Sequence, residues 1–417
     1  MRLQGKLLAA GLVSALAIGT AAVPPASAAS SILIWADLTK VNGLKALAAD
    51  FTKANPGVTI NVVNKNGLKD ALEKLTEPTG SPDIVIGAHD WIGNLSANGQ
   101  ILKISVSPAV KASFATDTLK AFSYGGNQYG MPMSVENIAW IQNSAIMGTK
   151  CPATLTEALA TMTAYEKKSG VTLTEKISVP GNDPYHFYPV FSALGGFVFG
   201  RSANGALDPN KVGLDNKTFL ANVAKYAPVW QKNGLFSNYA GKGAGAGGFD
   251  LKGNFQTGKS AVLWTGPWNA GKVFSLRDVK GMKLTFCPFP EIVKGIRSVP
   301  FSGVQGLMIT KFATAHGVEA QTKSFLNFVA GATQQTKYAA ATMVIPANKS
   351  AKAPTTTLNG FKNAGIYAVP MPNIPQMNSV WAQLGSGWSK SLAKENPSNP
   401  KTAWSDAANN VRDAVKG

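Results

Sequence analysis

The chain has 417 residues, more than a single hydrophobic core usually organises, and a formal net charge of +18. Its hydrophobic share of 45% and charged share of 15% are typical of a globular protein and exclude an intrinsically disordered chain. Because the lysines are scattered, without an arginine-rich stripe or a nucleic-acid motif, we interpret the charge as a solvated surface, loosely attracted at most to an anionic envelope, and expect no nucleic-acid partner.

The first 28 residues are typical of a cleavable signal peptide. Two basic residues precede an uncharged apolar stretch over residues 7–22, and residues 26–28, Ala-Ser-Ala, supply a cleavage pattern. A membrane anchor is the alternative, but the stretch is short for a bilayer span and two prolines follow it. No cysteine lies near the cleavage site, so a lipid anchor is not expected. We predict a mature chain from residue 29 that is exported to a periplasmic or other extracytoplasmic location.

The next part of the chain alternates between strand and helix patterns. The expected elements are strands at residues 31–35, 58–63 and 82–87, separated by helices at residues 43–54 and 67–75. This rhythm predicts an α/β fold with a mainly parallel sheet flanked by helices. Ligands of such sheets bind beyond the carboxyl ends of strands, and Asp37 and Asp90 follow two of these strands.

The alternation resumes in a second set of elements. These are strands at residues 138–142, 176–180, 260–264 and 284–287, and helices at residues 154–169 and 217–232. Two α/β lobes joined by several crossings would fit a chain of this length.

Residues 253–260 match the phosphate-binding loop pattern of nucleotide-binding proteins letter for letter. Such a loop follows a strand and opens a helix, whereas here the glycine-rich residues 241–248 precede the match and the strand at residues 260–264 follows it. The pattern instead favours a helix from Asp250 that ends at Gly258. We therefore do not expect nucleotide binding.

Residues 371–381, MPNIPQMNSVW, combine rigidity with a large ring. The two prolines fix φ and remove amide donors, so an extended backbone is expected. Asn378 and Ser379 then indicate the start of a helix that carries Trp381 on its second turn. A rigid segment directly before the helix would fix the position of the Trp381 ring, which could then serve as a stacking surface for a ligand.

Several other tryptophans stand where strands end or loops begin. Trp35 and Trp264 lie inside apolar runs, and we interpret them as core residues. Trp268 follows a Gly-Pro turn and, like Trp381, is expected to face a ligand. Sugar rings stack on such aromatic faces while polar side chains bind their hydroxyls.

Few residues suggest catalysis or metal binding. Cys151 and Cys287 are the only cysteines, and an exported chain could join them in a disulfide, but the sequence leaves their pairing open. His89, His186 and His316 lack metal-ligand spacing, and neither a carboxylate pair nor a Ser/His/Asp order marks a catalytic site. We expect no enzyme activity and no metal or other cofactor.

Six segments, in chain order, resemble the maltose-binding proteins, the sugar receptors of ABC importers. These segments are residues 81–90 (SPDIVIGAHD), 129–136 (YGMPMSVE), 183–185 (DPY), 258–268 (GKSAVLWTGPW), 301–304 (FSGV) and 371–381. The resemblance spans nearly the whole mature chain and implies a two-lobed periplasmic-binding-protein fold of type II. It implies lobes that comprise residues 29–135 with 291–344 and residues 136–290 with 345–417, and hinge crossings near residues 136, 288–291 and 344–346.

The same resemblance implies a sugar site between the lobes. The side chains expected to accept sugar hydroxyls are Asp90, Glu136 and Asp183. The rings expected to stack on the sugar are Tyr185, Trp268 and Trp381. Asp37 matches the family's first ligand loop only loosely, and Trp91 stands where enteric maltose receptors place a sugar-binding arginine.

Other positions depart from the family pattern. Gly87 stands where the enteric receptors have an aromatic residue, and Ala382 and Gly385 replace a tyrosine and an arginine. The predicted function is therefore a monomeric receptor that delivers an oligosaccharide, a maltodextrin or a related sugar, to an ABC permease. A receptor for a non-sugar solute such as a peptide or a cation is the alternative, and an envelope protein without a ligand is a third possibility.

Overall fold

The computed structural model describes residues 30–179, 183–203, 205–236, 254–269, 282–393 and 397–416. The predicted signal peptide, the glycine-rich residues 241–248 and the predicted helix start at Asp250 lie outside these ranges. Within them, every helix falls short of the length and apolar character that a bilayer span needs.

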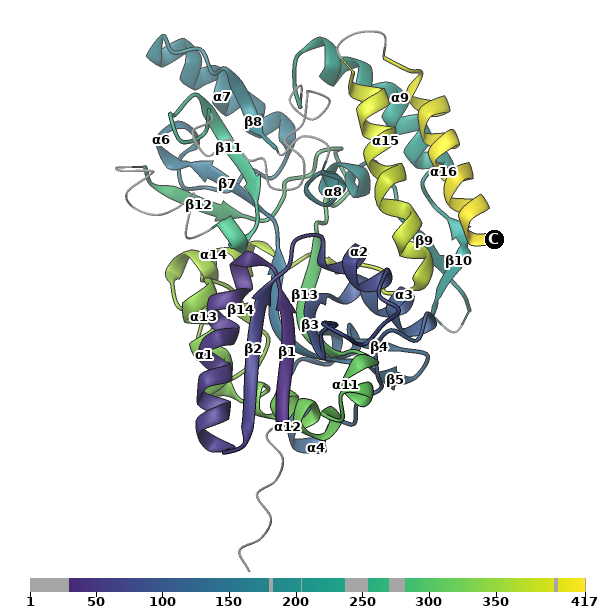
Figure 1. The fold of residues 1–417 in the computed structure, drawn as a ribbon. Coiled ribbons are helices and arrows are strands. Elements are labelled where there is room, and N and C mark those ends of the chain that lie inside the picture. The colour runs from purple at the N-terminus through teal and green to yellow at the C-terminus, as the bar shows by residue number, and fades with distance from the viewer. Residues whose placement is uncertain are drawn as a thin grey trace, which may run out of the picture.

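A seven-stranded sheet organises the first lobe, the lower half of Figure 1, in the order β14-β6-β13-β3-β1-β2 with β15 beside β13. Its strands are β1 (Ser30–Ala36), β2 (Val58–Asn64), β3 (Ile84–Ala88), β6 (Gly130–Asn137), β13 (Phe301–Ile309), β14 (Ile345–Pro346) and β15 (Val369–Pro370). Strands β2, β1 and β3 pair in parallel, as the alternation predicts. Strand β13 returns antiparallel between β3 and β6, so the carboxyl ends of β1 and β3 share an edge with the start of β13.

Short and long helices flank this sheet. They are α1 (Leu38–Ala54), α2 (Leu68–Glu73), α3 (Ile92–Ala97), α4 (Pro108–Ala112), α5 (Thr116–Lys120), α11 (Phe312–Ala315), α12 (Glu319–Val329) and α13 (Ala332–Thr342). A 3-10 helix, η1 (His89–Trp91), joins β3 to α3, and the pair β4 (Ser123–Tyr124) and β5 (Asn127–Gln128) forms a small hairpin. Ile32 and Ile34 of β1 and Leu44 and Leu47 of α1 are fully buried in the core that the sheet and helices share.

A four-stranded sheet, in the order β12-β7-β11-β8, organises the second lobe in the upper half of Figure 1. Its strands are β7 (Ala139–Asn143), β8 (Glu175–Ser178), β11 (Ser260–Thr265) and β12 (Leu284–Cys287), and β9 (Phe199–Arg201) pairs separately with β10 (Leu207–Val212). Its helices are α6 (Ser144–Met147), α7 (Leu155–Ser169), α8 (Pro184–Ala193), α9 (Lys217–Lys232), η2 (Pro267–Asn269), α14 (Thr356–Ala364), η3 (Pro375–Ser379), α15 (Val380–Leu392) and α16 (Pro400–Lys416).

Aromatic rings fill the core of the second lobe. Phe187 of α8 lies 4.6 Å from Trp388 of α15, and Phe191 lies 4.7 Å from Phe219 of α9, measured between ring centroids. These contacts join α8, α9 and α15 into one layer. The C-terminal helices therefore belong to the second lobe, far in sequence from the strands they cover.

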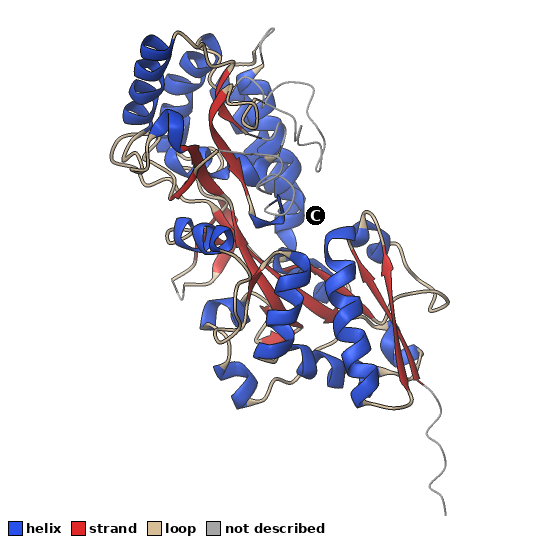
Figure 2. Ribbon diagram, turned by 90° about the vertical axis from the view of Figure 1, so that its left-hand side faces the viewer, coloured by secondary structure: helices blue, strands red, loops and turns tan. Residues whose placement is uncertain are grey.

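The chain passes between the lobes more than once. Strand β6 of the first sheet runs through Ile138 directly into β7 of the second, and residues 288–300 lead from β12 back to β13. Strand β14 pairs with β6, after which α14 packs against β12 and β15 returns to β13. Figure 2 shows strands that run between the two helix-covered ends of the molecule.

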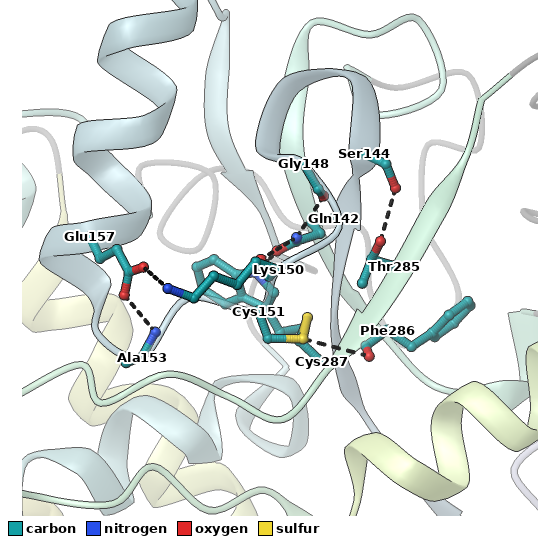
Figure 3. The surroundings of a disulfide bond; sticks show 11 residues. Gln142, Ser144, Gly148, Lys150, Cys151, Ala153, Glu157, Thr285, Phe286 and Cys287 are labelled. Atoms are coloured by element: carbon teal, nitrogen blue, oxygen red, sulfur yellow. Dashed lines mark hydrogen bonds and ion pairs between the residues drawn. A yellow bond between two sulfur atoms is a disulfide. The ribbon is translucent and has the colours of Figure 1, made fainter.

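Cys151 and Cys287 form a disulfide, which resolves the pairing that the sequence left open. The bond joins the connection between α6 and α7 to the end of β12, across a Cα–Cα distance of 5.6 Å (Figure 3). The Gln142 side chain donates to the carbonyl oxygens of Gly148 and Lys150, both at 3.0 Å, and so holds the same connection from β7.

The predicted strands and helices are present with small shifts of their ends, and three details differ. Helix α1 begins at Leu38, before the apolar spacing that predicts a helix at residues 43–54, because Asp37 caps it. Residues 254–258 form turns rather than the end of a helix, since the amides of Lys259 and Ser260 donate back to the Asn254 carbonyl oxygen. Strand β11 follows directly, whereas a phosphate-binding loop would open a helix at this point.

The third difference concerns the proline-rich segment. Pro375 opens the 3-10 helix η3 instead of continuing an extended backbone, and η3 includes Asn378 and Ser379. Helix α15 therefore begins at Val380, and Trp381 lies on its first turn rather than its second.

Candidate functional site

Asp90 and Trp381 make a contact between the two lobes. Asp90 lies on η1 directly after β3, and its Oδ2 accepts a hydrogen bond of 3.2 Å from Nε1 of Trp381 on α15. Its Oδ1 is buried and has no hydrogen-bond partner within the described residues. Burial raises the pKa of Asp90 to about 6, although the bond from Trp381 opposes this shift. The unpaired oxygen is a ready acceptor for a donor group of a ligand.

Glu136 lies at the end of β6, where the chain crosses to the second lobe. Its Oε1 accepts a hydrogen bond of 2.9 Å from Nε2 of Gln305 on the neighbouring strand β13. Burial raises the pKa of Glu136, the positive charge of Lys40 lowers it, and the carboxylates of Asp37 and Asp90 raise it further. Gln305 in turn lines a pocket together with Asp37 and Lys40, so the geometry also places Glu136 beside these two charged groups.

Asp37 has a structural role at the start of α1. Its Oδ1 accepts the Thr39 amide as an N-cap, and its Oδ2 forms an ion pair with Lys40. Partial burial raises the pKa of Asp37, but Lys40 and the bonds from Thr39 outweigh it and leave the pKa below its usual value. With 42% of its side chain exposed, Asp37 can still accept a further donor.

Asp183 likewise caps a helix. Its Oδ1 accepts the amides of Tyr185 and His186 at the start of α8, and its Oδ2 lies 2.6 Å from Nδ1 of His186. Burial raises the pKa of Asp183, but His186 and these amides lower it below its usual value. Both oxygens therefore have partners inside the protein, and the predicted contact of Asp183 with a ligand stays a prediction.

Four rings form a continuous series across the lobe boundary. Tyr185 lies 6.0 Å from Trp268 and 6.2 Å from Phe301, and Phe301 lies 5.8 Å from Trp381, between ring centroids. The Tyr185 hydroxyl donates to the Phe301 carbonyl oxygen at 3.3 Å. Phe301 is buried, whereas Trp268 and Trp381 are partly exposed at the two ends of the series. This arrangement offers two stacking faces on a rigid base.

Tyr185 connects this ring series to the carboxylates. Its pKa lies well above the usual value, because of burial first and then because of the negative charges of Glu136, Asp183 and Asp90. The structure therefore brings together seven of the eight side chains predicted for the site. Those seven are Asp37, Asp90, Glu136, Asp183, Tyr185, Trp268 and Trp381.

Trp268 belongs to this group through the ring series, and the eighth predicted residue, Trp91, lies beside it. Trp268 continues the ring series and packs edge-to-face on His186 at 5.5 Å. Trp91 lines a pocket of about 500 Å³ in the first lobe, together with Asp37 and Lys40. Trp35 and Trp264 are 7% and 0% exposed, which confirms that both are core residues.

Sequence reasoning missed several residues that support this region. Lys40 and Gln305 pair with predicted carboxylates, and Phe301 joins two predicted rings. The spacing of Asp37 and Lys40 along one helix turn could have indicated their pairing. Gln305 carries no local signal, because only the return of β13 beside β6 brings it to the site, whereas Phe301 opens residues 301–304, one of the segments of the family resemblance.

His89 anchors the proline-rich segment to the first lobe. Its Nδ1 accepts the Val304 amide and its Nε2–H donates to the Met371 carbonyl oxygen, both at 3.1 Å. Burial lowers the pKa of His89 to about 4, so the ring is neutral at pH 7. Gly93 lies so close to residues 373–375 that a side chain there would collide with their backbone. The segment that leads to Trp381 is thus fixed against the strand that leads to Asp90.

Among the described residues, no group of three or more His, Cys, Asp or Glu side chains is placed to hold a metal ion. The region instead combines carboxylates, two partly exposed indole rings and a buried unpaired oxygen. This combination suits a neutral polar ligand with apolar faces.

Comparisons with known proteins agree with this chemistry. The family model for bacterial extracellular solute-binding proteins matches residues 46–365. The chain is 29% identical to the maltodextrin-binding protein MdxE of Bacillus subtilis (strain 168), across 97% of this chain and 96% of that protein. It is 26% identical to the galactooligosaccharide-binding protein of the same organism, across 94% of this chain and 90% of that protein.

The fold of this chain is also similar to that of a solved structure. It is the crystal structure of a cyclo/maltodextrin-binding protein complexed with maltotetraose, with a TM-score of 0.75 and 24% sequence identity. The match covers 94% of this chain and 99% of that chain. At this identity the likeness shows the two-lobed fold.

Proposed function

Because the chain belongs to the bacterial extracellular solute-binding proteins, a family of transport proteins that act outside the cytoplasm, we propose that it is an oligosaccharide receptor. It binds a maltodextrin or a related sugar between its two lobes and delivers it to the membrane permease of an ABC importer. Two relatives whose names specify maltodextrin and galactooligosaccharide binding support this ligand class.

The observation that carries the proposal is the series of rings beside the carboxylates at the lobe boundary. Sugars expose apolar C–H faces that stack on indole rings and hydroxyls that donate to carboxylates. Trp268 and Trp381 supply the faces, while Asp90 and Glu136 supply acceptors, with Tyr185 between them. The unpaired Oδ1 of Asp90 supports the assignment, because a bound hydroxyl would satisfy it.

The surroundings of Trp381 leave the exact sugar open. Ala382 is exposed, and no described atom lies within 4 Å of the position where a side chain on Gly385 would begin. These two positions on α15 therefore offer neither a ring nor a cation to a ligand. We expect a sugar that fills more space at this end than maltose does.

The transport role has several parts that we include in the proposal. Residues 1–28 act as a cleavable signal peptide, and the mature protein is a periplasmic monomer. We divide the lobes into residues 29–135 with 291–344 and residues 136–290 with 345–417, and count β14 and β15 as crossing strands because both pair with the first sheet. The lobes close around the sugar about crossings near residues 136, 288–291 and 344–346. The receptor then docks on the transmembrane subunits of the importer. It performs no chemistry on its ligand.

A calorimetric screen of the mature protein tests this proposal. The panel contains maltotriose, maltotetraose, cyclic dextrins, trehalose and galactooligosaccharides, with a peptide mixture and divalent cations as non-sugar arms. We expect saturable heat from at least one oligosaccharide and its recovery intact after prolonged incubation. Saturable heat from the peptide mixture or the cations alone would contradict the sugar proposal and favour a receptor for a non-sugar solute. Cleavage of the sugar would contradict the proposed absence of enzyme activity.

A further inference from the structure

The ring of Trp91 packs directly on the backbone of a glycine in β3, Gly87. A Cβ atom built on Gly87 would lie 2.1 Å from Cζ3 and 2.3 Å from Cε3 of Trp91, distances that real side chains do not adopt. The indole therefore occupies the space that a side chain at position 87 would need. Trp91 can hold this position only because residue 87 is glycine.

This ring borders a pocket in the first lobe. The pocket has a volume of about 500 Å³ and is lined by Gly87 and Trp91 together with Asp37, Lys40, Lys65 and Gln305, among others. Charged and amide groups thus surround one aromatic surface. Hydroxyl-bearing rings with an apolar face match such a lining, whereas a purely apolar ligand would leave its polar groups unpaired.

The second lobe uses the same arrangement. A Cβ atom on Gly266 would lie 2.1 Å from Cζ3 of Trp268, directly after strand β11. Each lobe therefore presents an indole that rests on a glycine at the end of a strand. In both cases the bare backbone fixes the position of the ring.

We propose that Gly87 is a specificity-determining residue, which holds Trp91 as the stacking surface of a sugar-ring subsite in the first lobe. This inference rests on the proposed oligosaccharide function. It assigns to Gly87 the role of keeping the ring where the sugar needs it, without a contact of its own to the ligand.

A double-mutant cycle of Gly87→Ala and Trp91→Ala tests the inference, with the best ligand of the calorimetric screen as the probe. We expect each single substitution to raise the Kd about tenfold or more, because each removes the same stacking surface. The double variant should bind no more weakly than Trp91→Ala, since Gly87 acts through Trp91. Val229→Ala is the control, because Val229 is an exposed side chain of α9 outside the pocket and the ring series, and its Kd should not change.

Melting temperatures separate loss of the subsite from loss of the fold. If Gly87→Ala alone does not fold, the double variant should fold, since the colliding ring is gone; failure of the double variant to fold would overturn the inference. An unchanged Kd in Gly87→Ala, or an added loss in the double variant, would also overturn it while the wild-type protein still binds sugar. A wild-type protein that binds no sugar would instead defeat the proposed function, and this inference with it.

Discussion

At the scale of single residues, the two oxygens of Asp90 differ in their surroundings. One accepts the Trp381 indole N–H, and the other is buried without a partner in the described part of the chain. A buried acceptor without a partner lowers the stability of the free protein. This loss of free energy is regained when a ligand donates a hydrogen bond to the acceptor. A ligand hydroxyl at Asp90 would therefore gain more than one at an exposed carboxylate.

The raised pKa of Asp90 gives a pH dependence whose direction is fixed. Because folding raises this pKa from 3.8 to about 6, the stability contributed by Asp90 is fully present below the lower value and is lost as the pH rises through the higher one. We expect Asp90→Asn to gain up to about 3 kcal/mol of unfolding free energy relative to the wild type between pH 4 and pH 7. Denaturant unfolding at several pH values measures this difference, and a constant difference would contradict it.

Sugar binding should show the opposite trend. A hydroxyl that donates to Asp90 favours the ionised carboxylate, so affinity should rise by up to about tenfold from pH 5 to pH 7. Calorimetric titrations at the two pH values provide the measurement. The same titrations on Asp90→Asn serve as the control, in which most of the pH dependence should vanish.

The two partly exposed indoles give a third prediction. Trp268→Ala and Trp381→Ala should each weaken sugar binding by about 1–3 kcal/mol, because each removes a large ring that stacks on the ligand. Phe197→Ala is a suitable control, since Phe197 is an exposed ring of the second lobe outside the ring series. Equal affinity of wild type and both tryptophan variants would place the ligand elsewhere.

Single residues also show where sequence reasoning stops. The apolar runs around Trp35 and Trp264 were enough to predict their burial. The capping role of Asp183 was not foreseen, because the same Asp-Pro pattern suits a helix start and a ligand contact. The contact between the Trp91 ring and Gly87 could not be predicted from the sequence, since it depends on the ring folding back over the chain that separates the two positions.

At the scale of elements, the disulfide fixes an edge of the second lobe. It joins residues 136 positions apart, and the closed loop includes α7, α8 and β11. We expect Cys151→Ala/Cys287→Ala to lower the free energy of unfolding by about 2–5 kcal/mol, mainly because the unfolded chain becomes less constrained. Denaturant unfolding with and without reductant measures this effect, and the double variant should not respond to reductant.

The disulfide prediction has a clear contrary result. Full reduction of the wild-type bond, verified by thiol titration, with no loss of stability would contradict it. Sugar affinity should change little in either case, since both cysteines lie outside the ring series and the carboxylate group.

Element boundaries were predictable where apolar periodicity was strong, as in α7 and α9. The boundaries were less predictable where a capping side chain or a proline determines the end of a helix. Asp37 starts α1 before its apolar face begins, and Pro375 opens a 3-10 helix that moves the start of α15 to Val380. The Asp37 side chain caps α1, and the fixed φ of Pro375 suits the start of η3, so these local features rather than the hydrophobic pattern decide where the helices start.

At the scale of the whole molecule, alternating strands and helices predicted two α/β lobes, and the two sheets confirm them. The order of strands within each sheet could not be predicted, because it depends on β13 returning from residue 301 to lie between β3 and β6. That return is what brings Phe301 and Gln305 to the site. The lobe boundaries by residue number remain a prediction.

The Asp90–Trp381 bond and the ring series link the two lobes at the proposed site. A ligand that binds groups on both lobes shifts the population towards the closed form. The variants that remove Trp268 or Trp381 should close less completely at the same sugar concentration.

Small-angle X-ray scattering of the mature protein, with and without a saturating oligosaccharide, tests most directly whether the sugar is held between the lobes. The account predicts that the radius of gyration falls on saturation and that Trp381→Ala needs more sugar to reach the same value. A radius that stays unchanged while calorimetry shows the wild-type site to be full would contradict it.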